Sequence, residues 1–135
     1  MISNSRRHRD TAAETGQTMV EFVIVAPVLL MLLFGVIQFG IVFNNYLTVT
    51  DAARIGARKA AVSRLETTPA ALTEASVRAA AADLDRDKLE VDVDASAWTH
   101  GADVTVTASY PYEVSLLGFV VANGRVSSST TERIE

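Results

Sequence analysis

The chain has 135 residues, a length that allows one small folded domain beside a membrane anchor and leaves no room for two independent cores. Its net charge is −4 at pH 7 and it carries no Lys/Arg-rich stripe interleaved with aromatics, which argues against nucleic-acid binding. It contains no cysteine, which excludes disulfide frameworks, thiolate metal sites and cysteine nucleophiles.

The first predicted elements are a polar leader over residues 1–16 and an apolar stretch from Phe22 to Phe43, interrupted only by Gln38. A helix rises about 1.5 Å per residue, so this stretch covers the roughly 30 Å of hydrocarbon in a bilayer. A cleaved secretory signal has a shorter apolar region, and a domain of this size cannot surround a helix that is apolar on all sides. The sequence therefore predicts a transmembrane helix over residues 17–43.

Basic residues flank the predicted span on both sides. They are Arg6, Arg7 and Arg9 before it and Arg54, Arg58 and Lys59 after it. The leader cluster is compact and precedes the span, so we expect a cytoplasmic N-terminus and an extracytoplasmic domain over residues 44–135.

The extracytoplasmic domain is predicted to be helical over residues 44–85. Helix-compatible sequence runs from Asn44 to about Leu65, with small residues that allow another element to approach closely: Ala52, Ala53, Gly56, Ala57, Ala60 and Ala61. Thr68 and Pro69 then predict a new start, because Thr caps helices and Pro is favoured at their first position. A second helix is expected from Pro69 to about Asp85.

Residues 88–135 are predicted to form a sheet. Alternation predicts strands over Leu89–Ala95 and Asp103–Tyr110, with Pro111 ending the second, and a Ser/Thr-rich edge strand over Arg125–Glu132. The apolar segment Leu116–Val121 is expected to dock on the sheet or on the membrane surface. The predicted fold class is α+β: a long N-terminal transmembrane helix, a second shorter helix and a small antiparallel sheet of about three strands.

The chain carries acidic residues in two clusters, which are Asp83, Asp85 and Asp87, then Glu90, Asp92 and Asp94. They lack the loop glycine and terminal glutamate of a calcium loop, so we interpret them as a solvated acidic face. His8 and His100 have no partners at ligand spacing, and no nucleophile elbow or phosphate-binding glycine loop occurs. We expect no catalytic residue, no metal, no cofactor and therefore no enzyme.

Glu21 lies directly before the apolar stretch. A carboxylate at membrane depth is unfavourable, which favours a partner for it. Its position fits equally well a solvated residue at headgroup level, stabilised by the helix N-terminal dipole.

The residues around Glu21 resemble the type IV prepilin signal, with Gly16 ending a basic leader and Gln17, Glu21 and Phe22 following it. In that signal a prepilin peptidase cuts after the glycine and leaves glutamate as the fifth residue of the mature chain. The resemblance implies a processing site between Gly16 and Gln17. The new amine would lie one helical turn from Glu21, which could pair with this amine or with that of a neighbouring subunit.

The segment Val20–Leu30, with Pro27 six residues after Glu21, and the segment Asp51–Ala61 are similar to the TadE-like pseudopilins of the tight-adherence (Flp) pilus. The likeness covers roughly residues 16–61, and Ile55 departs from the polar residue expected there. It implies a minor pilin-like subunit of the inner membrane that supports assembly of an adhesive type IVb pilus.

The implied partners are the prepilin peptidase, other pilin-like subunits, the inner-membrane pilus machinery and membrane lipid. Glu21, Phe22 and Pro27 are the expected assembly residues, although Pro27 fits a passive kink equally well. The alternative is an uncleaved, membrane-tethered periplasmic or surface binding module.

Overall fold

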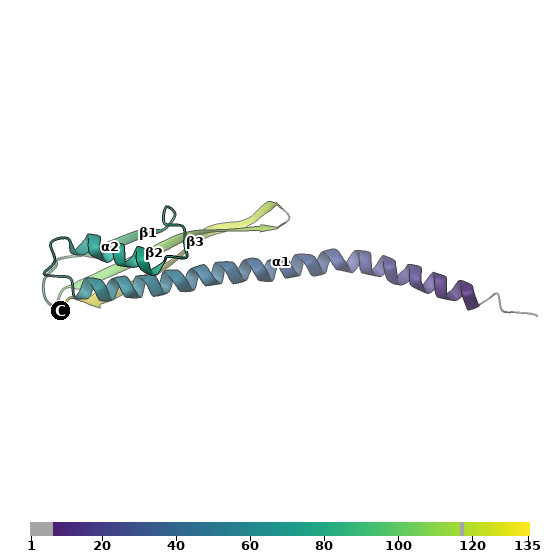
Figure 1. The fold of residues 1–135 in the computed structure, drawn as a ribbon, viewed down its shortest axis with the longest axis horizontal. Coiled ribbons are helices and arrows are strands. Elements are labelled where there is room, and N and C mark those ends of the chain that lie inside the picture. Colours follow the sequence, from purple (N-terminus) through teal and green to yellow (C-terminus); the bar gives the residue numbers. More distant parts are fainter. Residues whose placement is uncertain (1–6, 117) are drawn as a thin grey trace, which may run out of the picture. The chain divides into compact units, whose positions relative to one another are not determined.

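The computed structural model describes the backbone of residues 7–116 and 118–135, and the side chains from residue 16 onward except residue 117. Its elements are α1 (Arg7–Ala61), α2 (Pro69–Ala80), β1 (Glu90–Ala95), β2 (Asp103–Leu116) and β3 (Phe119–Arg133) (Figure 1). The predicted α+β class, with a long apolar N-terminal helix, a shorter helix and a three-stranded antiparallel sheet, is confirmed.

The chain divides into two compact units, an N-terminal unit (Met1–Ile37) and a C-terminal unit (Gln38–Glu135). Helix α1 contributes to both. In the N-terminal unit α1 runs through Pro27 without interruption, although a proline removes one helical hydrogen bond. Residues 1–6 of the predicted leader lie outside the described residues, and residues 7–16 belong to α1.

The C-terminal unit is built on an antiparallel sheet with the strand order β1-β2-β3. Alternation in β2 places Val104, Val106 and Ala108 on one face, where all three are fully buried. Thr105 and Thr107 lie on the other face and bond across to Thr131 and Ser129 of β3, at 2.8 and 2.9 Å. The sheet therefore has one apolar face for the helices and one hydroxyl-rich face.

Small side chains allow α1 and α2 to pack closely on the apolar face of the sheet. The core cluster consists of Val49, Ala52, Ala53, Ala57, Ala60, Val77, Ala81, Leu84, Leu89, Val104, Val106, Ala108 and Ile134. A Cβ added at Gly56 would overlap Cγ2 of Val77 and lie 3.2 Å from Cγ1 of Val106. The close approach predicted for the small residues of this segment is thus observed, and Gly56 lies at its tightest point.

Helix α1 ends at Ala61, so the predicted end near Leu65 is wrong. The carbonyl of Ala61 accepts a hydrogen bond from the backbone N–H of Glu135, at 2.9 Å. The N–H of Ser63 bonds to the carbonyl of Ala60, which tightens the chain into a turn. The last turn of α1 is therefore held by the far end of the chain.

Helix α2 begins at Pro69, as predicted, and Thr68 takes the capping position without a side-chain cap bond. The helix ends at Ala80, and the predicted end near Asp85 is wrong. Leu84 and Leu89 are both buried in the core, which requires the chain to turn after α2. The Arg78 guanidinium holds this turn by donating to the carbonyls of Arg86 and Leu89, at 2.9 and 3.1 Å.

Strand β2 continues through Pro111 to Leu116, so the prediction that Pro111 ends it is wrong. The pairing of β2 with β1 stops at Ser109, and beyond it β2 pairs only with β3. Proline lacks an N–H and is tolerated where a strand has an open side. Because β1 ends before this point, β2 has an open side at Pro111, where no N–H is required.

Strand β3 lies at an edge of the sheet, as predicted, but begins at Phe119 and not at Arg125. Leu116 pairs with Phe119, and Gly118 has a φ of +86°. The predicted docking of Leu116–Val121 on the sheet is wrong for the described residues, because Leu116 and Phe119–Val121 belong to the β2–β3 hairpin itself.

Candidate functional site

The predicted processing and assembly residues lie on the N-terminal part of α1. Gly16, Gln17, Glu21 and Phe22 are all exposed, and nothing lies within 4 Å of a Cβ built at Gly16. Residues four apart in a helix share one face, so α1 places Gln17 and Glu21 on the same side. Helix α1 therefore holds the Glu21 carboxylate one turn from Gln17.

Glu21 borders a shallow hollow of about 240 Å³ on the surface of α1, lined also by Thr18, Phe22 and Val25. The structure gives Glu21 no ion pair with any residue from 16 onward whose side chain it describes. A carboxylate beside an exposed aromatic ring and a valine can bind a cation that arrives with an apolar helix.

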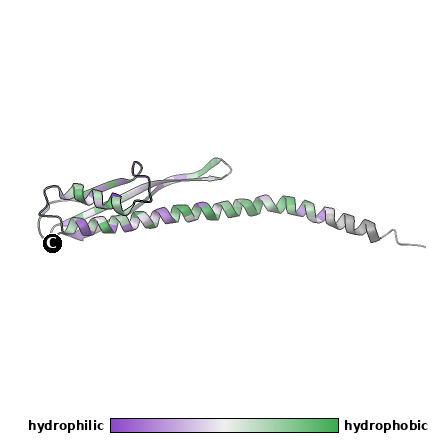
Figure 2. Cartoon of the chain, in the orientation of Figure 1, coloured by the Kyte–Doolittle hydropathy of each residue, from purple (hydrophilic) through white to green (hydrophobic). Residues whose placement is uncertain are grey.

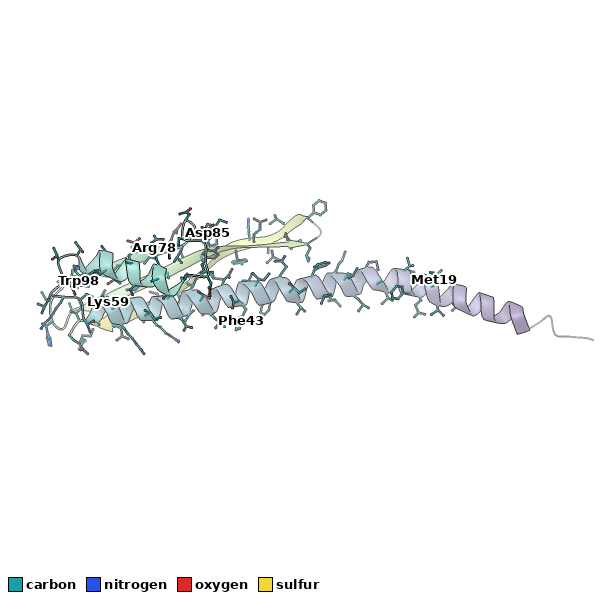
Figure 3. The ribbon with its side chains drawn as sticks, in the orientation of Figure 1. Met19, Phe43, Lys59, Arg78, Asp85 and Trp98 are labelled. Atoms are coloured by element: carbon teal, nitrogen blue, oxygen red, sulfur yellow. The ribbon has the colours of Figure 1, made fainter. Side chains whose placement is uncertain are left out.

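The helix beyond Glu21 exposes apolar side chains around its whole circumference. Sixteen of these lie from Phe22 to Phe43, and Figure 2 shows this part of α1 as hydrophobic: Phe22, Val23, Ile24, Val25, Val28, Leu29, Leu30, Met31, Leu32, Leu33, Phe34, Val36, Ile37, Phe39, Ile41 and Phe43. Side chains project from both sides of α1 between the labelled Met19 and Phe43 (Figure 3).

Among the described residues, Gly16–Ala61 is the one helix long and apolar enough to cross a membrane, with a mean hydropathy of 2.7 over its most apolar segment. None of that segment is buried within the protein. A helix that is apolar on all sides and uncovered is typical of a membrane span.

The segment Asp51–Arg58 of α1 presents two different faces. Its small residues are buried under the sheet, whereas Arg54, Ile55 and Arg58 are exposed and border a hollow of about 330 Å³ with Asp51. Arg54 lies 3.8 Å from the Asp51 carboxylate. Sequence reasoning did not single out this exposed face, although the helical period of the small residues was the signal that could have found it.

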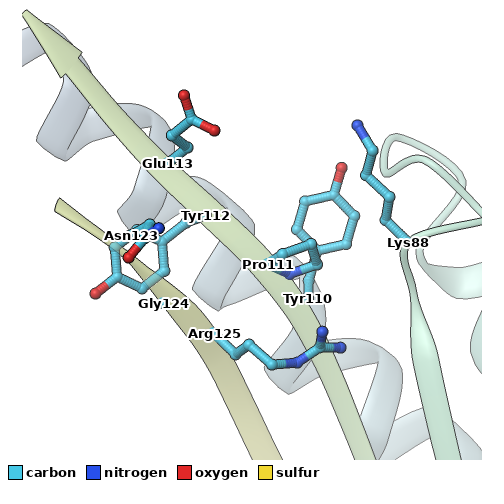
Figure 4. A pocket seen from close by; sticks show the side chains of 8 residues that line it. All are labelled: Lys88, Tyr110, Pro111, Tyr112, Glu113, Asn123, Gly124 and Arg125. Atoms are coloured by element: carbon cyan, nitrogen blue, oxygen red, sulfur yellow. The ribbon is translucent and has the colours of Figure 1, made fainter. Parts of the chain in front are cut away.

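An open groove of about 590 Å³ lies on the sheet where β1 has ended. It is lined by Lys88, Tyr110, Pro111, Tyr112, Glu113, Asn123, Gly124 and Arg125 (Figure 4). The Tyr112 hydroxyl lies 2.9 Å from a Cβ built at Gly124, so the tyrosine packs over its cross-strand glycine. The sequence did not predict this groove, because its residues meet only through the β2–β3 register.

The predicted acidic face is on β1, where Glu90, Asp92 and Asp94 are exposed. Arg125 of β3 reaches across β2 to Glu90 at 2.8 Å and also donates to the Ser109 hydroxyl at 3.1 Å. Within the described part of the chain, no group of three or more His, Asp or Glu side chains could hold a metal ion. On this face Glu90 is ion-paired with Arg125, and Asp92 and Asp94 are exposed.

The comparisons with known proteins give one match. The model of the family described as TadE-like protein matches residues 16–58, which is less than half of the chain. No curated protein and no solved structure matches the chain. The matched segment begins at Gly16, covers Glu21, Phe22 and Pro27, and ends with the Arg54–Arg58 face. Residues 16–58 are TadE-like, as the resemblance in the sequence predicted.

Proposed function

We propose that the protein is a pilin-like minor subunit, a pseudopilin, that supports assembly of a tight-adherence type IVb pilus. The TadE-like match supports a subunit related to pilus assembly, and it carries the proposal because it begins at Gly16, where a prepilin peptidase would cut. The protein acts by binding other pilin-like subunits and the inner-membrane pilus machinery. It carries out no catalysis and needs no cofactor.

In the proposed topology residues 17–43 cross the inner membrane, with the N-terminus in the cytoplasm and residues 44–135 outside it. The uncovered apolar surface of α1 supports this arrangement, because burial in lipid is the simplest way to remove it from water. The exposed Arg54, Ile55 and Arg58 then lie outside the membrane, on the side of α1 away from the sheet, where partner subunits can reach them.

Processing is proposed to occur after Gly16. A residue without a side chain obstructs a peptidase least, and the space around Gly16 is open. The cut would create a charged amine at Gln17 next to the membrane. Glu21 would then pair with that amine, or with the amine of a neighbouring subunit, and so place adjacent helices in a defined stagger.

Gly16→Ala is expected to leave residues 1–16 attached, whereas the parent chain loses them in cells that contain the peptidase. Intact-mass measurement of the purified protein distinguishes the two forms. Gly35→Ala is the matched control, since Gly35 lies in the same helix with nothing within 4 Å of its Cβ position. A parent chain with its leader still attached would contradict the proposal and favour the uncleaved, tethered binding module.

Glu21→Gln is expected to preserve processing and membrane insertion but to weaken association with partner subunits by roughly tenfold, because it removes a charge-assisted hydrogen bond. Crosslinking yield and pilus counts in cells provide the measurement. Glu66→Gln, at an exposed carboxylate after α1, is the matched control. Unchanged piliation would assign Glu21 to the solvated, interfacial role.

The tethered binding module remains the second candidate because of the groove in Figure 4. Two tyrosines and two basic side chains on an open surface are a chemically plausible binding site. The mass measurement above separates the two functions, since a module of this kind retains its leader.

A further inference from the structure

The end of the β2–β3 hairpin is apolar on both faces. Phe119 is 76% exposed, Val120 54% and Val121 57%, and these consecutive residues point to alternate sides of the ribbon. No charged residue occurs between Glu113 and Arg125. A hairpin in water normally keeps one polar face, so this end of the hairpin suits an apolar surrounding. Figure 2 shows it as hydrophobic.

The C-terminal unit itself places this end of the hairpin beside the apolar stretch of α1. Gln38 Nε2 donates a hydrogen bond to the carbonyl of Ser115, at 3.3 Å. Further along α1, Gly56 lies against Val106 of β2. Strand β2 therefore runs antiparallel to α1 and brings its last residues to the level of Gln38, which is inside the apolar stretch that ends at Phe43.

We propose that the hairpin tip, defined as Leu116 and Phe119–Val121, rests in the outer interfacial layer of the membrane that α1 spans. This inference depends on the membrane anchoring in the proposed function and adds a second lipid contact to it. Lipid is favoured over a protein partner because the neighbouring residues on α1 are themselves the end of the proposed span. The absence of charge in the tip agrees with such a position.

The depth of the tip is limited by its backbone. Beyond Ser109 β2 lacks a neighbour on one side, and β3 lacks one along its outer edge. Unpaired backbone groups are not tolerated in hydrocarbon, so the tip belongs at the boundary of headgroups and acyl chains, roughly 5–10 Å deep. Tyr46, 43% exposed just after the apolar stretch, fits the same layer, where aromatic residues are enriched.

A second contact would limit how far the C-terminal unit can tilt relative to the membrane surface. With the tip held at the interface, the exposed Arg54, Ile55 and Arg58 would stay at a constant height above the membrane, where neighbouring subunits can reach them.

The natural absence of cysteine allows a direct test with single-cysteine variants of the full chain. Phe119→Cys reports on the tip, Leu30→Cys on the proposed span, and Ser127→Cys, exposed further along β3, serves as the matched control. Each is labelled with an environment-sensitive fluorophore and reconstituted in phosphatidylcholine/phosphatidylglycerol vesicles. Emission from Trp98, which packs partly buried against the core, verifies the fold of each variant.

The expected result is that nitroxide-bearing phospholipids quench the labels at 119 and 30, and that aqueous iodide loses access to both. The label at 127 should show the reverse. If iodide quenches 119 as it does 127 while 30 remains lipid-exposed, the tip lies in water, and the inference fails although the anchor stands. If 119 is shielded from both quenchers, protein and not lipid covers the tip, and the inference fails. If lipid does not reach 30, the anchor and the inference fail together.

Discussion

Replacing Ile134 by alanine is expected to lower the free energy of unfolding of the C-terminal unit by about 2–5 kcal/mol, the range for truncating a buried isoleucine. Ile134 is the second-last residue of the chain, yet only 1% of it is exposed and it belongs to the core cluster. Urea unfolding of the detergent-solubilised protein, followed by Trp98 emission, measures the loss.

The backbone bonds around Ile134 make this a specific test of its side chain. Its N–H donates to the Ala102 carbonyl and its carbonyl accepts from the Gly101 N–H, both at 2.8 Å. Glu135 bonds to Ala61. Alanine keeps all three bonds, so the loss isolates the cavity left by the isoleucine side chain.

Ile55→Ala is the matched control for this prediction, because Ile55 is 50% exposed on the outer side of α1. A surface substitution away from the core changes stability by about 0.5 kcal/mol or less. Equal losses for the two variants would show that Ile134 does not fill the core as described. A stable Ile55→Ala protein also leaves that exposed face available for tests of partner binding.

The sequence predicted those parts of the fold that depend on local periodicity. The continuous apolar stretch up to Phe43 predicted a long helix, and alternation over Leu89–Ala95 predicted β1 almost to its ends. The small residues of Asp51–Ala61 predicted a close approach, because side-chain volume is a local property. These features require no knowledge of which segments meet.

The predicted ends of α1, α2 and β2 were wrong where a residue from another part of the chain determines the end. The end of α1 depends on Glu135, and the end of α2 depends on Arg78 reaching the carbonyl of Leu89. The passage of β2 through Pro111 depends on where β1 stops. Each case is a tertiary contact that overrides a local propensity, and no single segment contains both partners.

The candidate site divides in the same way. Gly16, Gln17 and Glu21 could be proposed from the sequence because their relation is a spacing along one helix, and their roles stay predictions. The groove between Tyr112 and Arg125 could not, because it arises from the register of β2 and β3 and from the early end of β1. In the sequence, Ile55 was noted only as a departure from the family pattern. Its exposure could not be predicted, because it follows from the burial of the neighbouring Gly56 and Ala57.

Gly56→Ala is expected to destabilise the C-terminal unit by about 1–3 kcal/mol, even though alanine favours a helix over glycine by about 1 kcal/mol. The added methyl would overlap Cγ2 of Val77 and crowd Val106. Val77 is β-branched and therefore stiff in α2, so its side chain cannot easily rotate away. The shift in the urea midpoint, again from Trp98 emission, measures the effect.

Two further variants test whether the overlap with Val77 causes the destabilisation by Gly56→Ala. Gly40→Ala lies in the same helix with nothing within 4 Å of its Cβ position, so it should be neutral or slightly stabilising. In a Val77→Ala background, which removes the overlapping methyl, Gly56→Ala should lose most of its destabilising effect, and a double-mutant cycle gives the coupling. Equal destabilisation in both backgrounds would contradict the packing described for α1 and α2. The destabilisation by a side chain at position 56 would then have to come from a contact other than the one with Val77 of α2.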